Sequence, residues 1–249
     1  MRPCWPRPAA RGTTSGASGS RTASRTATTG SMATTPSSSL SPRSAAMSSS
    51  ADDDLAIRSL RQRWAFHRDQ GDFTGMSGCF HPEATASISW FNGKVADLVP
   101  LLAASDAARK PGEHGKHGVG NCRVEQRGDR ALLESDMAIL IREYIDGQLF
   151  DYTGHCRFLD QVERRAGKWG ILHWTAIFDK DRLDPAQGEA PAWLREVDLA
   201  TPDAGLAFMR LRQRRKGRDV PASTVVGGSE AERQLRRDAW AWLERRDGQ

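Results

Sequence analysis

Two residues whose side chains could together form a general base are Asp69 and His117, which lie 48 positions apart. A histidine whose one ring nitrogen is held by a carboxylate keeps a single tautomer and gains basicity. Its other nitrogen can then take a proton from an acidic carbon. The positions alone also allow a simpler interpretation, with Asp69 on the surface and His117 hydrogen-bonded in a loop. Whether the two side chains can contact each other depends on the fold.

Four further side chains are predicted to contact a substrate near this pair: Trp90, Arg142, Tyr144 and His155. Arg142 would supply a cation, a role that Arg157 could also fill, and His155 would act as a second acid. Strand register decides whether each arginine faces a cavity or solvent. A structural role for His155 stays open.

We expect neither a metal nor an organic cofactor. His81, His114 and His173 have no carboxylate beside them at the spacing of metal ligands. The cysteines form no CxxC pair, which argues against a zinc site and against a disulfide framework, and indicates a reducing compartment. The four cysteines are Cys4, Cys79, Cys122 and Cys156.

The segment that carries Asp69 predicts the order helix, helix, strand, helix. An amphipathic helix runs from Asp52 to about Gly71, and Asp72 could cap a short second helix. Residues 83–91 alternate as a strand, and residues 95–108 return to helical spacing. The apolar residues of the first helix are Leu55, Ile57, Leu60, Trp64 and Phe66.

The segment that carries His117 predicts an antiparallel meander with short turns at Arg127-Gly128-Asp129, Asp146-Gly147 and Ala166-Gly167. Helices can cover one face of such a sheet only in part when it curves strongly, so a conical cavity remains. The predicted fold class is an α+β cone-shaped half-barrel. The expected strands are residues 119–126, 131–145, 149–164 and 168–179.

Residues 1–50 carry six arginines and no acid, so the net charge of +5 divides into +6 for this tail and −1 for the rest. Such a composition predicts disorder. It resembles a transit peptide, but a true start at Met32 or Met47 is favoured. We find no secretory signal, and no apolar run approaches the roughly 20 residues of a membrane span. A cytoplasmic protein without membrane contact is expected.

Residues 186–249 predict a helical extension that packs on the pocket domain of residues 51–185, or on a second subunit. A basic stretch runs from Arg210 to Lys216, with no aromatic residues interleaved. This stretch favours a solvated helical face over contact with nucleic acid.

Several short motifs in this order resemble the SnoaL-like proteins of the nuclear transport factor 2-like superfamily. The resemblance covers about residues 52–185 and includes scytalone dehydratase and the hexachlorocyclohexane dehydrochlorinases. It implies an aspartate at Asp69 and a catalytic histidine base at His117. The motifs span residues 64–73, 81–84, 116–125, 164–169 and 175–185.

The chain also departs from this family pattern. The second pocket histidine of scytalone dehydratase falls on Ile141, and its two tyrosines correspond to Arg68 and to a residue near Trp90. These departures put dehydration by that same set of residues in doubt. The dehydrochlorinases need only the aspartate–histidine pair and a cationic helper.

These observations predict a cofactor-free lyase or isomerase of the dehydratase type, acting on a small, apolar and cyclic substrate. The alternative is a binding or scaffold module of the same fold without catalysis. In either case we expect a homodimer formed through the open face of the sheet.

Overall fold

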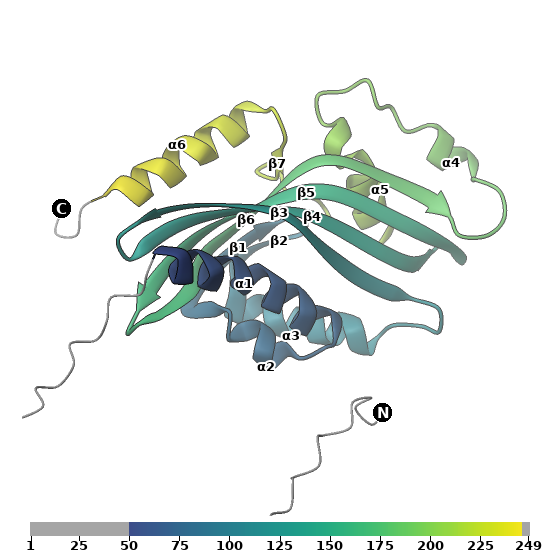
Figure 1. Cartoon of the computed structure of the whole chain (residues 1–249). Coiled ribbons are helices and arrows are strands. Elements are labelled where there is room, and N and C mark those ends of the chain that lie inside the picture. The colour runs from purple at the N-terminus through teal and green to yellow at the C-terminus, as the bar shows by residue number, and fades with distance from the viewer. Residues whose placement is uncertain (1–49, 246–249) are drawn as a thin grey trace, which may run out of the picture. The chain divides into compact units, whose positions relative to one another are not determined.

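The computed structural model describes residues 50–245. The prediction of a disordered tail concerns residues outside this range, apart from Ser50, which begins the first helix. Figure 1 shows a strongly curved sheet with three helices on one side and a C-terminal helix on the other. The three helices are α1 (Ser50–Asp69), α2 (Phe73–Ser77) and α3 (Val95–Ala107). The predicted α+β half-barrel is confirmed.

The sheet has the strand order β2-β1-β6-β5-β4-β3, and the short β7 pairs with β6. Neighbouring strands are antiparallel except for β1 with β6 and β6 with β7. The hairpin turns of the meander fall at the three predicted places. The strands are β1 (Phe80–Ile88), β2 (Phe91–Lys94), β3 (His114–Arg127), β4 (Arg130–Ile145), β5 (Gln148–Arg165), β6 (Lys168–Pro185) and β7 (Val225–Val226).

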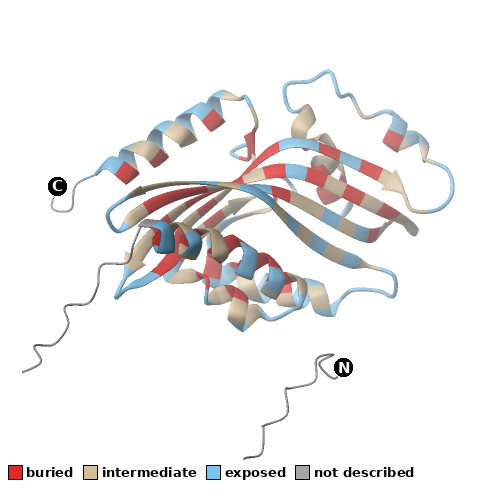
Figure 2. Ribbon diagram, viewed as in Figure 1, coloured by how far each residue is buried: buried red, intermediate tan, exposed pale blue. Residues whose placement is uncertain are grey.

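Irregular pairing bends the long strands. The register shifts between Val119 and Cys122 in β3, and twice along the β5–β6 ladder, where Leu172 and Asp179 are extra residues of β6. Such bulges increase local twist and bend a strand. Figure 2 shows buried residues alternating with more exposed ones along these strands. One face of the meander is therefore concave and buried.

Two boundaries differ from the predicted ones in a way that matters for the site. The predicted strand 83–91 is two strands, β1 and β2, with Ser89 and Trp90 in the turn between them. The strand β3 begins at His114, five residues before the predicted start, because it pairs with the end of β4. His117 consequently lies within a strand and not in a loop.

The buried face of α1 is narrower than its apolar residues suggested. Ile57, Leu60 and Trp64 are at most 2% exposed, whereas Leu55 is 69% and Phe66 is 64% exposed. The buried positions follow the 3- and 4-residue spacing of a helix, and the two exposed residues fall about half a turn away from it. Leu55 and Phe66 are therefore apolar residues of this helix that lie outside its buried face.

An ion pair inside the core ties the middle of α1 to β5. Arg61 and Asp160 have fully buried side chains, and Arg61 Nε donates to Asp160 Oδ2 at 2.8 Å. A second guanidinium nitrogen donates to the other carboxylate oxygen. Burial raises the pKa of Asp160, and the charge of Arg61 opposes this rise. The guanidinium carbon also lies 4.7–4.9 Å from the ring centroids of Trp64, Phe158 and Trp174.

The two ends of α1 are held by further polar contacts. Near its start, Asp53 accepts hydrogen bonds from Trp169 Nε1 at 2.8 Å and from Arg164 at 3.0 Å. Near its end, Arg68 donates to both carboxylate oxygens of Asp106 in α3, at 2.8 and 3.1 Å. The helix is therefore fixed along its length.

The C-terminal segment packs on both sides of the sheet. Helix α6 covers part of the outer face, where it buries Leu132, Leu159 and Ile177 against Ala239 and Leu243. The expected homodimer through the sheet stays a prediction, and it would have to use the uncovered part of this face. The elements of the segment are α4 (Ala192–Arg195), the 3-10 helix η1 (Ala204–Leu206), α5 (Ala207–Arg215), β7 and α6 (Glu230–Glu244).

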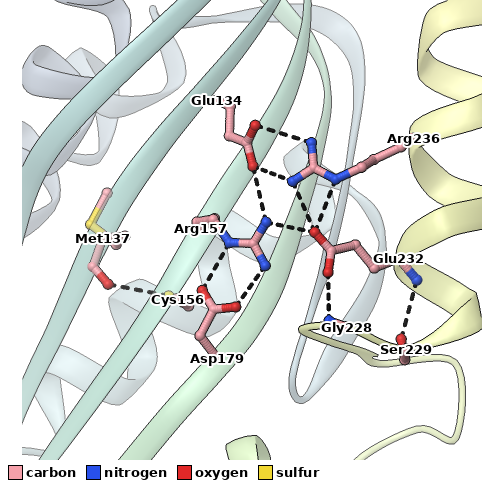
Figure 3. Close-up of polar contacts among 9 residues, drawn as sticks. All are labelled: Glu134, Met137, Cys156, Arg157, Asp179, Gly228, Ser229, Glu232 and Arg236. Carbon is pink, nitrogen blue, oxygen red and sulfur yellow. Dashed lines mark hydrogen bonds and ion pairs between the residues drawn. The ribbon is translucent and has the colours of Figure 1, made fainter.

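Polar contacts at one end of α6 converge on Arg157, as Figure 3 shows. Arg157 donates to Asp179 of β6 at 2.6 and 2.9 Å, to Glu134 of β4 at 3.2 Å and to Glu232 of α6 at 2.5 Å. Arg236 of α6 also donates to Glu134. These forked charge-assisted bonds set where the helix sits on the sheet.

The start of α5 is anchored by one carboxylate of β6. Asp181 accepts hydrogen bonds from the backbone nitrogens of Phe208 at 3.2 Å and Met209 at 2.6 Å. Burial raises the pKa of Asp181 from 3.8 to about 6, although these two bonds oppose the rise.

None of the helices within residues 50–245 is long and apolar enough to cross a membrane.

Replacing Asp160 by asparagine should destabilise the protein by about 3–5 kcal/mol, because Arg61 would keep its buried charge without a counter-charge. Urea unfolding followed by circular dichroism measures this free energy. Asp151→Asn is the matched control, since its partner Arg142 is 47% exposed and the pair is on the surface. A loss in Asp160→Asn no larger than in the control would contradict the structural importance of the buried pair.

A second prediction concerns pH. Because the folded-state pKa of Asp181 lies above its unfolded value, its contribution to stability is fully present below pH 3.8 and is lost as pH rises through about 6. The unfolding free energy of the wild type, relative to Asp181→Asn, should therefore fall by about 1 kcal/mol between pH 5 and pH 7. Urea titrations of both proteins at the two pH values test this; a constant difference would contradict it.

Candidate functional site

The structure brings Asp69 and His117 into direct contact. Asp69 is the last residue of α1, and its Oδ1 lies 2.7 Å from His117 Nδ1. The second oxygen, Oδ2, accepts a hydrogen bond from the backbone nitrogen of His117 at 3.0 Å. The carboxylate thus bonds the ring and the backbone of one residue at once. This geometry places the proton on Nδ1 and the ring lone pair on Nε2.

The surroundings of Asp69 favour its ionised form. Its side chain is only 3% exposed, and burial alone would raise its pKa. The hydrogen bonds from His117, together with Lys116 at 3.2 Å, outweigh burial and lower the pKa. Asp69 is therefore a carboxylate at neutral pH, as a residue that orients a histidine must be.

The imidazole of His117 borders a cavity of about 520 Å³ between the concave face of the sheet and the helices. Its ring packs edge-on against Trp64, with the ring centroids 5.1 Å apart. Asp69 does not border the cavity, so His117 is the member of the pair that a ligand would meet. The apolar part of the lining includes Leu98, Leu102, Ile139, Ile141, Phe158, Trp174, Ala176 and Phe178.

Three of the four predicted ligand-binding residues, Trp90, Arg142 and Tyr144, border the same cavity. Trp90 lies in the β1–β2 turn. Arg142 is engaged elsewhere, because its guanidinium donates to both carboxylate oxygens of Asp151 at 2.6 and 2.7 Å.

His155 does not border this cavity, and its predicted role there is corrected. It is exposed, while its neighbours Gly154 and Cys156 are buried. Side chains alternate along a strand, so His155 faces outward when Tyr152 and Phe158 face the core. Arg157 follows the same alternation and meets α6 instead of a ligand.

A polar cluster at the cavity was not predicted from the sequence. It joins a carboxylate of the sheet to two basic residues of the C-terminal segment. Glu143 of β4 is 4% exposed and accepts a hydrogen bond from Arg212 of α5 at 3.0 Å. Lys216 donates to the same carboxylate. Burial opposes ionisation of Glu143, but Arg212 and Lys216 outweigh it and lower the pKa. The interpretation of residues 210–216 as a solvated face was wrong for Arg212, which is buried, whereas Lys216 is exposed as predicted.

Little in the sequence could have revealed this cluster. Arg212 and Lys216 are four residues apart and so share one face of a helical turn. Their partner Glu143 lies 69 positions from Arg212, and pairing over that distance leaves no local pattern.

Buried polar atoms at the cavity lack a partner within residues 50–245. The indole nitrogens of Trp64 and Trp174 and the amide oxygen of Gln213 are buried without a hydrogen bond to another described residue. All three side chains border the cavity. An unpaired buried polar group is costly, so such atoms suit a site whose ligand carries oxygen atoms or N–H and O–H donors.

No group of three or more histidine, cysteine, aspartate or glutamate side chains within residues 50–245 is arranged to hold a metal ion. The pair of Asp69 and His117 offers a histidine oriented by a carboxylate, beside a cavity whose lining is partly apolar and partly charged.

Comparison with known proteins identifies the family to which this domain is similar. The family model of the SnoaL-like domain matches residues 49–175. Pea pathogenicity protein 2 of Fusarium vanettenii is 31% identical over 150 residues, which cover 58% of this chain and 60% of that protein. The match thus spans less than two thirds of the length of this curated relative.

Two solved structures are similar to part of this chain. A candidate scytalone dehydratase from Novosphingobium aromaticivorans is 13% identical, with a TM-score of 0.45, over 55% of this chain and 90% of that one. A type 2 hexachlorocyclohexane dehydrochlorinase is 17% identical, with a TM-score of 0.48, over 57% of this chain and 95% of that one. The family match covers half of the chain, and the chain therefore belongs to the SnoaL-like domain family.

Proposed function

We propose that this protein is a cofactor-free lyase or isomerase that removes a proton from carbon with His117. The observation that carries the proposal is the 2.7 Å contact between Asp69 Oδ1 and His117 Nδ1, made at the wall of a cavity of about 520 Å³. A solvent-exposed structural histidine would need neither the buried carboxylate nor the cavity. The apolar walls fit a small cyclic substrate.

The reaction begins when Nε2 of His117 takes a proton from a carbon next to a carbonyl group. The electron pair of the broken C–H bond moves toward the carbonyl, and Asp69 stabilises the imidazolium that forms. In dehydration, the electron pair then forms the C=C bond, and the β-hydroxyl leaves as water with the proton from His117. In isomerisation, the imidazolium returns its proton to the γ-carbon and the double bond moves.

The residues that differ from the family pattern support this single-base scheme. Ile141 and Arg68 both border the cavity, at positions where the resemblance to scytalone dehydratase implies a histidine and a tyrosine. The side chain of Ile141 has no ionisable group, and Arg68 forms an ion pair with Asp106. A mechanism in which His117 both takes and returns the proton does not require those two groups.

The activity can be tested with cyclic β-hydroxyketones and β,γ-unsaturated ketones of one or two rings. Dehydration of the first and isomerisation of the second both give a conjugated enone, whose ultraviolet absorbance reports turnover. His117→Ala should lower kcat by at least about a hundredfold, the usual contribution of a general base. Asp69→Asn should also lower kcat, because the amide cannot stabilise the imidazolium.

His155→Ala is the matched control, since it removes a histidine from the outer face and should leave turnover unchanged. Unfolding free energies of all the variants should be measured as well, and His117→Ala is expected to stay within about 1 kcal/mol of the wild type. Full turnover in His117→Ala would contradict the proposal. Binding of the ketones without turnover by the wild type would favour the binding-module alternative.

A further inference from the structure

The C-terminal segment brings an excess of positive charge to one part of the cavity. Arg212, Lys216 and Arg218 all border it, and Glu143 is the carboxylate that Arg212 and Lys216 share. Arg218 forms no ion pair with another residue of the range 50–245, and its guanidinium carbon lies 5.3 Å from the ring centroid of Trp90. Three cations thus face one anion.

Only part of this charge excess is shielded from water. Arg212 is 6% exposed as a residue, whereas Arg218 is half-buried and the side chain of Lys216 is 29% exposed. Burial lowers the pKa of Lys216, and the neighbouring charge of Arg212 lowers it further, although Glu143 opposes both effects. A further anion in the cavity would relieve the repulsion among these cations.

Other charged groups at the cavity do not cancel the excess. Arg68 and Arg109 share Asp106, and Arg142 is paired with Asp151. Glu113 borders the cavity but accepts hydrogen bonds from two backbone nitrogens, those of Lys110 and Tyr144. These carboxylates are engaged away from the cluster of Arg212, Lys216 and Arg218.

We propose that the substrate of this cavity carries a carboxylate or a similar compact anionic group, which binds to Lys216 and Arg218. The buried amide of Gln213, whose oxygen has no partner among residues 50–245, borders the same cavity and could accept a hydrogen bond from the ligand. The three cationic residues lie beyond residues 49–175, the part that matches the family model. The anion site is therefore an addition that this chain makes to the shared cavity.

The inference rests on the proposed function only in taking this cavity as the substrate site. It narrows the substrate from a small apolar ring to a ring with an acidic substituent. The apolar walls would hold the ring, and Trp90, whose face is covered by Arg218, would lie beside the anionic group.

Two fluorescent probes that differ by one charge test this inference. 8-Anilinonaphthalene-1-sulfonate and N-phenyl-1-naphthylamine share the same rings, and only the first carries an anion. Titration of the full chain should give a Kd about tenfold lower for the sulfonate than for the neutral amine, because charge-assisted bonds to partly buried cations are strong. Equal affinity for the two probes would overturn the proposal without any variant being made.

Variants then locate the anion site. Lys216→Met and Arg218→Gln should each weaken binding of the sulfonate by about fivefold or more and leave binding of the amine unchanged. Arg214→Gln is the matched control, because it removes one charge at an exposed position near the end of α5, two residues before Lys216, that does not border the cavity. Equal weakening in the control, or no weakening in the two variants, would contradict the proposed site.

The outcome is separable from that of the catalytic proposal. Probe binding does not depend on proton transfer, so His117→Ala should retain the preference for the sulfonate even where it loses turnover. If turnover depends on His117 but the probes bind equally well, the catalytic proposal stands and the anion site fails. If the sulfonate binds more tightly but turnover does not depend on His117, the anion site stands and the catalytic proposal fails.

Discussion

The ion pair of Arg61 and Asp160 is the contact on which the rest of the site depends. It is fully buried, and it joins the middle of α1 to β5 beneath the aromatic rings of the core. Asp69 lies eight residues farther along the same helix, about two turns away. The ion pair therefore fixes the position of the Asp69 carboxylate relative to the sheet. A buried pair tolerates little displacement, because separating the charges leaves each without compensation.

The cavity joins two parts of the chain with different contributions. The segment that matches the SnoaL-like family model supplies the oriented histidine and most of the apolar walls. The segment after Pro185 supplies Arg212, Lys216 and Arg218, and Asp181 at the end of the sheet anchors the helix on which Arg212 lies. In the two proposals, the catalytic base and the anion-binding residues thus lie on separate elements that share one cavity.

Much of the fold could be predicted from local pattern, since the hairpin turns carry glycine at their tight positions and α1 shows helical spacing. Gly147 and Gly167, for example, adopt positive φ values of 84° and 77°. The approach of Asp69 to His117 was predicted from motifs, not from spacing. The side of the sheet on which His155 lies depends on register, and the pairing of Glu143 with Arg212 depends on tertiary contacts; neither has a local signature.

Helix α6 gives the outer face of the sheet a hidden apolar surface. Leu132, Leu159 and Ile177 are covered by the chain's own last helix, after the region that defines the family. A fragment cut near Pro185 would retain the whole meander yet present these side chains to water, and Glu134 and Arg157 would lose their α6 partners Arg236 and Glu232. The part of the chain that matches the family model therefore shares a buried apolar surface with a helix that lies outside that match.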